Sequence, residues 1–507
     1  MPAIIVALGK QNQKTNATIR RNRHGNGKYT RGMRATIGIL LANGDITMTI
    51  QRQDGCEQPY VGDKLKLRFP FIHYRIEYQD FIQGAILSCI PLGITAAMVK
   101  VLDIPIEIAV LMVVINNFLY LLHTSFGDPS IAGWITAGVP LYISYLNSFT
   151  PGPERIQALI ALQLLVGLIF LLLGLTGITK YVIRHFPVSM RAGILLGAGF
   201  ASLMRVFDPE QPFIGQMPIA FLSAAVISCF ILFSARGMTY RQKYGWFAWI
   251  AGFGIAPGFV IGYLIGLITG EIAPPVGVFD QFIIAIPMGD MLAKFSALGV
   301  GLPSLGTLAA AFSLAIVAYV LAFGDILVLE ALINDANKAR PDEKIVFNVS
   351  RNHIITAIRN LGQGIAMPYL PLCGPQWTGG QALVVNRFKH ASPEQEPSYW
   401  GGATSIFWGM SLAMVFHPIV QIILPAKLIG FGLTLFIQGY LCVYIAFAMC
   451  QTNVQRGIAG VMGAVLVTAN YVELWNSPFW SGPTMALITG AILFFALEYE
   501  SEETMVA

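Results

Sequence analysis

Two stretches decide the fold of this chain: GDPSIAGW at residues 127–134 and GPQWTGG at residues 374–380. Each places glycine and proline at the start of an otherwise apolar segment, and proline is tolerated in a helix only within its first turn. A helix that begins at such a point leaves its first N–H groups without intrahelical partners. Those groups and the helix dipole favour negative charge or hydrogen-bond acceptors. The sequence therefore predicts two helix starts that can form a binding site without a cationic side chain.

The composition places these helix starts in a membrane. Of the 507 residues, 55% are hydrophobic and only 12% are charged, whereas soluble domains carry about a quarter charged residues. These values exclude a soluble globular enzyme, a disordered protein and a fibrous protein. Long unbroken apolar runs also argue against a transmembrane β-barrel, in which apolar and polar residues alternate. We therefore expect an all-α polytopic membrane protein.

About fourteen transmembrane segments are expected after residue 75. They are residues 78–99, 105–124, 129–147, 156–178, 187–204, 214–235, 245–269, 304–331, 351–370, 377–388, 399–418, 424–448, 457–471 and 482–497. Residues 277–300 are apolar but interrupted by Pro287 and Gly289, and we expect them to be interfacial or half-inserted. Lys and Arg gather in the loops that follow even-numbered segments. The positive-inside rule then places these loops and both termini in the cytoplasm.

The chain repeats a weak pattern after seven segments. Segments 3 and 10 open with the two stretches quoted above, while segments 5 and 12 open with HFP (185–187) and ILP (423–425). An odd number of segments in each repeat gives the two halves opposite orientations. We therefore expect a 7+7 inverted repeat, a plan in which secondary transporters bind their solute at interrupted helices near the membrane midplane.

The first 75 residues differ from the rest, because they hold 13 Lys and Arg against four Asp and Glu. We expect residues 1–75 to form a small basic, soluble cytoplasmic segment that contacts anionic lipid. Its basic residues form no nucleic-acid-binding motif. Residues 35–51 alternate around Asn43-Gly44-Asp45, which predicts a β-hairpin. Residues 499–507 are expected to be a short cytoplasmic tail.

Carboxylates within the apolar segments are the leading candidates for coupling chemistry. A charged side chain in a transmembrane segment is costly and is a functional hypothesis by default. Asp325 and Glu330 lie in segment 8, and Asp128 opens segment 3. We expect all three to bind a coupling H⁺ or Na⁺. The alternatives are that Asp128 caps the start of segment 3 and that Glu330 lies at the membrane interface.

Polar and small residues near the interruptions complete the expected solute site. Its expected members are Gln83, Asp128, Pro129, Ser130, Asp325, Gln376, Trp377, Thr378, Gly379, Gly380 and Gln381. Asn116, Asn117 and His123 are expected to bridge helices. Arg359 and Gln363 are expected to be structural.

We expect no metal site, cofactor or enzymatic chemistry. The six cysteines form no CxxC pair and the seven histidines show no metal-ligand spacing, so buried thiols are expected rather than a zinc site or disulfides. The sequence contains no Walker loop, no GxSxG elbow and no nucleophile–base constellation. Any pumping would therefore have to be secondary.

The chain resembles the uracil-permease-type fold that the sulfate permease family shares with the nucleobase/ascorbate transporters. Four stretches carry the likeness: FPVSMRAG (186–193), GDILVLE (324–330), NLGQG (360–364) with GPQWTGG (374–380), and LP (424–425). The likeness covers roughly residues 76–498. Sulfate permeases commonly carry a C-terminal regulatory domain. Because this chain stops soon after segment 14, we expect a divergent branch without that domain.

The resemblance implies two domains and a homodimer. A core (transport) domain would comprise residues 76–178 and 304–420, and a gate (scaffold) domain residues 180–300 and 421–498. The solute would lie between segments 3 and 10, with residues of segments 1 and 8 around it. Transport would then proceed by alternating access, as the core domain moves against the gate domain.

From these features we expect a multi-pass secondary active transporter of the cell (inner) membrane that carries a small polar solute. An anion such as sulfate, bicarbonate or a carboxylate is favoured, because residues 376–386 contain no carboxylate and Thr378-Gly379-Gly380 resembles the sulfate permeases. Asp128 argues against an anion, since its charge would compete for the same N–H groups. The alternatives are a nucleobase proton symporter of the uracil or xanthine type and an anion channel.

Overall fold

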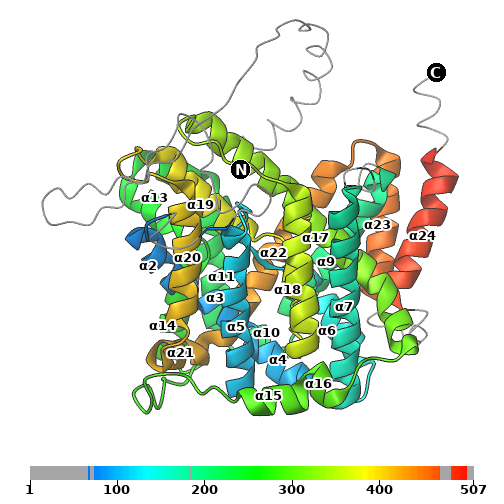
Figure 1. Cartoon of the computed structure of the whole chain (residues 1–507), viewed down its shortest axis with the longest axis horizontal. Helices are drawn as coiled ribbons and strands as arrows, with labels where there is room; N and C mark the ends of the chain where they lie inside the picture. The colour runs from blue at the N-terminus through cyan, green and yellow to red at the C-terminus, as the bar shows by residue number, and fades with distance from the viewer. Residues whose placement is uncertain (1–66, 69–73, 180, 182–184, 469–480, 500–507) are drawn as a thin grey trace, which may run out of the picture. The chain divides into compact units, whose positions relative to one another are not determined.

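The computed structural model describes residues 67–68, 74–179, 181, 185–468 and 481–499 (Figure 1). The β-hairpin expected at residues 35–51 lies outside the described residues. So do most of the basic N-terminal segment and nearly all of the expected tail. Within the described part, helices account for almost every element.

The first seven expected segments are all present as helical elements, in order. They are α2 (Tyr78–Leu87), α3 (Cys89–Gly93) and α4 (Thr95–Leu102); α5 (Ile106–Ser125); β1 (Gly133–Trp134), η1 (Thr136–Gly138) and α6 (Val139–Asn147); α7 (Pro153–Thr176); α9 (Val188–Phe207) and α10 (Pro212–Gln216); α11 (Pro218–Phe233) and α12 (Ala235–Lys243); and α13 (Gly245–Gly252) and α14 (Ala256–Thr269).

The second seven segments follow a connecting stretch that contains two short helices. The elements are α15 (Met288–Phe295) and α16 (Ala297–Val300); α17 (Leu305–Ala339); α18 (Val349–Ala366); β2 (Cys373–Gly374) and α19 (Thr378–His390); α20 (Tyr399–Ala413); α21 (His417–Ile423), η2 (Leu424–Ala426) and α22 (Lys427–Met449); α23 (Asn453–Thr468); and α24 (Gly482–Leu497).

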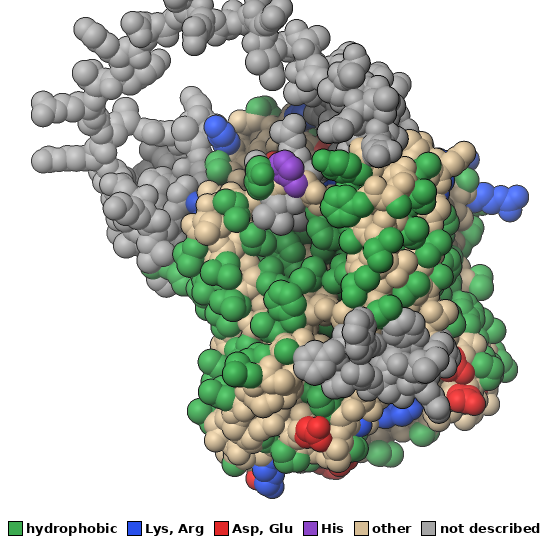
Figure 2. Space-filling view, turned by 90° about the vertical axis from the view of Figure 1, so that its right-hand side faces the viewer, with side chains coloured by type: hydrophobic (Ala, Val, Ile, Leu, Met, Phe, Trp, Pro, Cys, Tyr) green, Lys and Arg blue, Asp and Glu red, His purple; other side chains and the backbone are tan. Residues whose placement is uncertain are grey.

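The length and composition of these helices fit a multi-pass membrane protein. Six helices are long and apolar enough to cross a bilayer, and the number rises to eight if each of two bent helix pairs is one span. Figure 2 shows one face on which hydrophobic side chains gather over the middle of the molecule while charged side chains lie toward its two ends. This distribution is the one that a bilayer around the middle would select.

Some helix boundaries differ from the sequence prediction, each for a physical reason. The helix of segment 8 was expected to end at residue 331, but α17 continues to Ala339. Asp335 on this extra length forms an ion pair with Lys389 of α19, so a polar helix is stabilised beyond the apolar run. Segment 9 was expected to reach residue 370, but α18 ends at Ala366, and Pro368 and Pro371 follow in the sequence.

The helices pack in two groups. In the first group, α7 packs against α17 and α18, α20 packs against α2 and α5, and α19 packs against α17. In the second group, α9 packs against α22 and α23, α11 packs against α14, and α23 packs against α24. The two groups meet where α3 and η1 contact α22, where η1 and α6 contact α9, and where α17 contacts α9 and α24.

The stretch between α14 and α17 crosses from the second group to the first. Its helices α15 and α16 lie across the lower ends of the longer helices in Figure 1. Ile283 forms an isolated antiparallel bridge with Phe416, between α20 and α21. The connection from α14 to α15 is therefore hydrogen-bonded to the connection from α20 to α21. Ile284 N donates to Val415 O at 3.0 Å, and His417 N donates to Phe282 O at 3.1 Å.

Candidate functional site

The two stretches that open segments 3 and 10 meet in the interior as a two-stranded antiparallel sheet. Gly133 pairs with Gly374 and Trp134 pairs with Cys373. A helical element follows each strand, η1 and α6 after β1 and α19 after β2. Because the strands are antiparallel, the two helical elements leave the sheet in opposite directions.

Glycine permits the close approach of the two strands. A Cβ atom added to Gly133 would lie 2.7 Å from the Cβ atom of Trp377, and one added to Gly374 would lie 2.8 Å from the backbone carbon of Trp134. Neither distance is one that real side chains adopt, and the second obstacle is backbone, which has little freedom to yield. The glycines of the two stretches therefore serve packing between the strands.

Further hydrogen bonds join the residues that precede β1 to the residues that follow β2. Trp377 N donates to Ile131 O at 2.6 Å, and Ser130 Oγ donates to Pro375 O. The side chain of Gln381 accepts from Ile131 N at 2.7 Å and donates to the hydroxyl of Tyr399 at 2.6 Å. The side-chain amide of Gln381, which was expected in the solute site, is therefore hydrogen-bonded to the residue two positions before β1 and to Tyr399.

Two side chains of α18 hold the strands from behind. Asn360 accepts a hydrogen bond from Cys373 N and donates one to Cys373 O, both at 2.9 Å, and so pairs with β2 as a further strand would. The guanidinium of Arg359 donates to Gly374 O at 3.0 Å and to Gly133 O at 3.2 Å. One buried cation therefore bridges the carbonyl groups of both strands.

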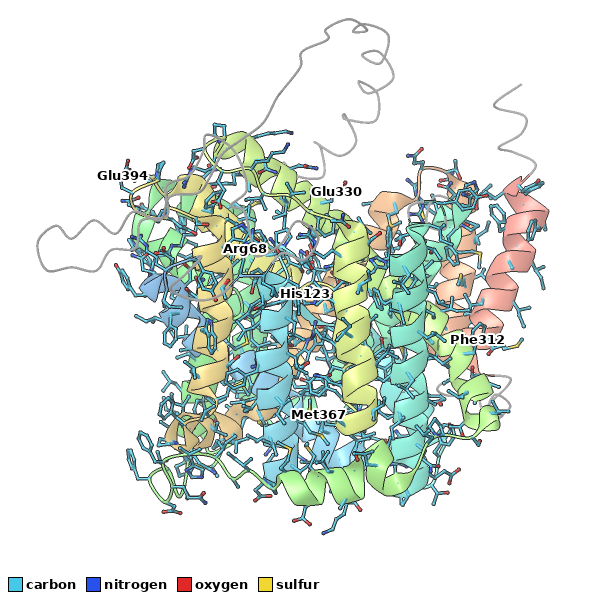
Figure 3. All side chains as sticks on the ribbon, viewed as in Figure 1. Arg68, His123, Phe312, Glu330, Met367 and Glu394 are labelled. Atoms are coloured by element: carbon cyan, nitrogen blue, oxygen red, sulfur yellow. The ribbon has the colours of Figure 1, made fainter. Side chains whose placement is uncertain are left out.

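Asp128 lies in the same buried network, a few residues before β1. Its carboxylate accepts from Asn352 Nδ2 at 2.7 Å and lies 2.6 Å from His123 Nδ1. The other ring nitrogen of His123 lies 3.2 Å from Arg359 Nη1, and Figure 3 shows His123 between the helices. Asp128 and its two partners are fully buried. The hydrogen bonds to Oδ2 offset part of the cost of burying this carboxylate, whereas its Oδ1 has no hydrogen-bond partner in the described structure.

Asp325 lies at the amino end of α19. The hydroxyl of Thr378 donates to Asp325 Oδ1 at 3.0 Å, which joins α17 to the first residue of α19. The N–H groups of Thr378, Gly379 and Gly380 have no acceptor within the helix, and no backbone acceptor outside it in the described part of the chain. Gly379 is exposed, so this helix start can be reached from outside the protein.

Gln376 precedes these free N–H groups and is the unusual polar residue of the site. Its side chain is only 1% exposed, yet neither its Nε2 nor its Oε1 has a hydrogen-bond partner in the described structure. A buried amide without partners costs free energy, by about 1–3 kcal/mol for each group. Gln376 is therefore a candidate for direct contact with a bound molecule.

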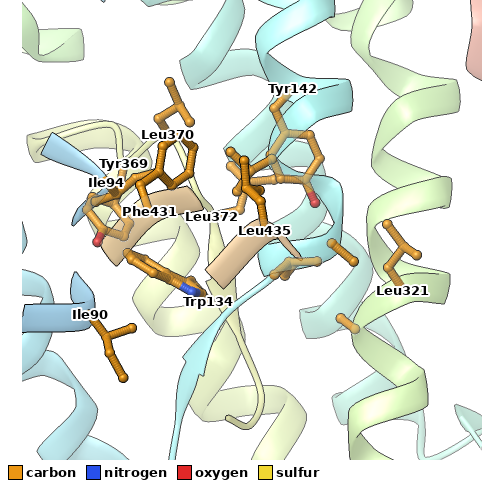
Figure 4. Close-up of a cluster of buried hydrophobic side chains, with 14 of the residues drawn as sticks. Ile90, Ile94, Trp134, Tyr142, Leu321, Tyr369, Leu370, Leu372, Phe431 and Leu435 are labelled. Carbon is orange, nitrogen blue, oxygen red and sulfur yellow. The ribbon is translucent and has the colours of Figure 1, made fainter. Parts of the chain in front are cut away.

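Apolar side chains enclose the other side of the strand pair (Figure 4). Trp134 stacks on Tyr369 with 6.2 Å between ring centroids, and Ile90, Ile94 and Phe431 belong to the same buried cluster. These side chains come from both helix groups. The strand pair thus lies where the two groups meet.

Two further expected residues, Glu330 and Gln83, lie on α17 and α2. Glu330 follows Asp325 by five residues on α17, and Figure 3 shows it near the upper end of the helices. Gln83 is half-buried on α2, which packs along α20. Within the described residues, no group of three or more His, Cys, Asp or Glu side chains is placed to hold a metal ion.

The polar residues of α18 and α20 were missed as contributors to the site. Asn352, Asn360 and Tyr399 were not singled out as site residues in the sequence, although all three are buried. Asn352 is hydrogen-bonded to Asp128, Asn360 to Cys373 of β2, and Tyr399 to Pro129 O. The available signal was the number of amide side chains in segment 9, which is high for a transmembrane helix. Their partners lie far away in the sequence and could not be deduced from it.

No protein-family model matches the chain, and no curated protein matches it. Among solved structures, the transmembrane domain of a cyanobacterial bicarbonate transporter, BicA, is similar over 82% of this chain and 96% of that chain, with 15% identity and a TM-score of 0.48. The murine anion transporter Slc26a9 in its inward-facing state is similar over 84% of this chain and 69% of that chain, with 14% identity and a TM-score of 0.48.

Proposed function

We propose that this protein is a secondary active transporter of a small anion such as sulfate, bicarbonate or a carboxylate, coupled to H⁺ or Na⁺. The observation that carries the proposal is the hydrogen bond between Asp325 and Thr378 at the amino end of α19, beside free backbone N–H groups. A fixed carboxylate there occupies the electrostatic position that an anion would prefer. When a proton or Na⁺ binds the carboxylate, its negative charge is neutralised and an anion can bind at the same helix start.

The coupling follows from this competition for one positive site. While Asp325 is charged, its repulsion opposes a second negative charge at the same helix start. A proton or Na⁺ on Asp325 removes the repulsion, so cation and anion bind together more tightly than either alone. That mutual dependence is the thermodynamic requirement for symport.

The inverted repeat and the count of fourteen spans are part of the proposal, and the packing of the helices supports both. The contact of α2 with α20 corresponds to that of α17 with α7 when segments are exchanged by seven. The contact of α5 with α20 corresponds in the same way to that of α18 with α7, and α11 with α14 to α23 with α24. The antiparallel pairing of β1 with β2 agrees with halves of opposite orientation.

We assign the first helix group to the core domain and the second to the gate domain, in an inner-membrane homodimer with both termini in the cytoplasm. The division is supported by packing, because α7, α17, α18, α19 and α20 associate mainly with one another or with α2 and α5. The strand pair and Asp325 belong to the first group. Movement of this group against the second would carry the site as one body between the two sides of the membrane.

Gln376 favours a second candidate, a nucleobase–proton symporter. Its side-chain amide offers one donor and one acceptor side by side, both without partners. That pair is complementary to the N–H and C=O edge of a pyrimidine such as uracil. A nucleobase would also stack on an aromatic ring, and Trp377 is the adjacent residue in the sequence.

Uptake into proteoliposomes tests these candidates directly. The full chain is reconstituted, and labelled sulfate, bicarbonate, dicarboxylates and uracil are offered with an inward H⁺ or Na⁺ gradient. Accumulation of an anion that collapses when the cation gradient is dissipated supports the proposal, whereas accumulation of uracil alone supports the second candidate. Currents far above carrier turnover, with no dependence on a cation gradient, would instead indicate an anion channel.

A further inference from the structure

The chain turns sharply between α11 and α14, and this corner has its own small core. The axis of α12 is bent by 62° from that of α11, and α13 meets α14 at 80°. Ile231, Phe247 and Ala251 form an apolar cluster separate from the main hydrophobic core. The α12–α13 corner, defined as residues 235–252, therefore has a fixed shape of its own. In Figure 1, α13 lies at the end of the helices opposite α15 and α16.

Interlocked aromatic rings stiffen the corner and expose two tryptophans. The ring of Tyr240 lies 6.2 Å from that of Phe230 and 5.7 Å from that of Phe247, in edge-to-face contacts. Trp246 is 64% exposed and Trp249 is 68% exposed. Exposed tryptophans on a rigid support are typical of the boundary between lipid and water, where the ring is apolar and its N–H can meet a headgroup.

The charge of the corner has one sign. Arg236, Arg241 and Lys243 lie on α12, while residues 211–270 contain neither Asp nor Glu. Arg236 and Lys243 are exposed, and no described residue forms an ion pair with either. The guanidinium of Arg241 already has one partner within the protein, because it donates to Ile231 O near the end of α11 at 2.8 Å.

Exposed apolar side chains lead from the spans into the corner on both sides. On α11 they are Ile219, Leu222, Val226 and Phe230, and on α14 they are Val260, Ile261, Leu264 and Ile268. This apolar surface faces lipid if the helices cross a bilayer. Beyond this apolar surface, the corner carries cations and tryptophans. A membrane protein shows the same order of side chains from the hydrocarbon layer to the lipid headgroups.

We propose that the α12–α13 corner docks the headgroups of anionic phospholipids, with Arg236 and Lys243 contacting phosphate groups while Trp246 and Trp249 sit at the level of the glycerol backbone. The complementary charge and the continuity with the apolar faces of α11 and α14 favour lipid over a protein partner. The inference depends on the chain's being embedded in a membrane and not on the solute that it carries. A failure here would leave the transport proposal untouched.

The experiment uses the full chain in nanodiscs of phosphatidylcholine with increasing phosphatidylglycerol, and it measures the thermal unfolding midpoint. The midpoint of the parent is expected to rise with phosphatidylglycerol. In an Arg236→Gln/Lys243→Gln variant, the apparent affinity for phosphatidylglycerol should fall roughly fivefold for each cation removed. A Lys338→Gln/Lys344→Gln variant is the matched control, because these two lysines are also exposed but lie in a stretch that contains Asp335, Asp342 and Glu343.

A second measurement does not depend on unfolding. Phosphatidylglycerol that carries a nitroxide near its headgroup should quench part of the tryptophan fluorescence, and a Trp246→Phe/Trp249→Phe variant should lose that quenched part. Equal phosphatidylglycerol dependence of the parent and the Arg236→Gln/Lys243→Gln variant would overturn the proposal. An equal loss in the lysine control, or quenching that survives removal of both tryptophans, would overturn it as well.

Discussion

Asp325 accepts a hydrogen bond from the Thr378 hydroxyl at 3.0 Å, although 53 residues separate them in the sequence. The contact joins the middle of α17 to the first residue of α19, at the point where backbone N–H groups lack helical partners. A carboxylate and a helix start thus meet without a cationic side chain between them. In the proposed function, the charge of a coupling cation and the charge of an anion would compensate each other at this pair.

Asp325→Asn is expected to abolish accumulation of solute while leaving exchange across the membrane intact. The amide keeps a hydrogen bond to Thr378 but cannot bind a proton or attract Na⁺, so the gradient is no longer coupled to the solute. Uptake against a gradient and equilibrium exchange in proteoliposomes measure the two properties separately. Glu330→Gln on the same helix is the matched control. Undiminished accumulation by the Asp325→Asn variant would refute the coupling role.

Gly374→Ala is expected to destabilise the protein by about 1–3 kcal/mol and to reduce transport. The added methyl group would lie 2.8 Å from backbone atoms of Trp134, so the two strands must separate to accept it. The thermal unfolding midpoint in detergent checks the change. Gly362→Ala on α18 is the control, because no atom lies within 4 Å of its added Cβ and alanine favours a helix. A Gly374→Ala variant as stable as the parent would contradict the packing argument.

Arg359→Lys is expected to lower the free energy of unfolding by about 2 kcal/mol, despite keeping the positive charge. The guanidinium reaches Gly133 O and Gly374 O at once, whereas an ammonium group lacks the planar fork that spans two carbonyl groups. The carbonyl left without a donor would be buried and unsatisfied. Unfolding in mixed micelles measures the difference. Arg155→Lys, at a helix end where the arginine also donates to backbone carbonyls of Val101 and Phe149, should cost less.

The stability of the protein is expected to fall as pH rises from about 4.5 to about 8, because of Glu396 in the loop between α19 and α20. Burial, and then the charge of Asp80, raise the pKa of Glu396 from 4.5 to about 8, although Arg387 opposes the shift. Within this window the folded state holds a proton that the unfolded state has released, so rising pH favours unfolding. One such group gives a slope of up to about 1.4 kcal/mol per pH unit.

A Glu396→Gln variant should lose this contribution to the pH dependence. Its unfolding midpoint, measured at several pH values, should vary less than that of the parent. Glu394→Gln serves as the control, because Glu394 is exposed and its pKa is lowered, chiefly by a hydrogen bond with Ser392. Identical pH profiles for the parent and the Glu396→Gln variant would show that Glu396 does not hold the proton.

The helices could be predicted from the sequence because their signals are local. Apolar runs and prolines set most of the boundaries, and each of the fourteen expected segments corresponds to a helical element in the structure. One exception has a non-local cause. The extension of α17 to Ala339 depends on the ion pair of Asp335 with Lys389, and a pairing over that distance leaves no periodic trace in the sequence.

The candidate site could be located but not assembled from the sequence. The glycine–proline stretches indicated where helices begin, and Asp325 was identified from the cost of a carboxylate in a span. The pairing of β1 with β2 and the hydrogen bond of Ile131 N to Gln381 use backbone groups that any residue carries. The hydrogen bond of Gln381 with the Tyr399 hydroxyl joins two helices, and no local pattern in the sequence indicates it. Asp128 was expected to bind solute or a coupling cation, or else to cap segment 3, and its hydrogen bonds with His123 and Asn352 could not be foreseen from the sequence.

The glycines of the strand pair also limit how the protein can work. In the proposed function, a solute bound at the strand pair would not be released by separation of the strands, because Gly133 and Gly374 pack closely and Arg359 donates to a carbonyl group of each strand. The proposed transport cycle therefore requires the strand pair and the first helix group to move together, as one body, against the second group.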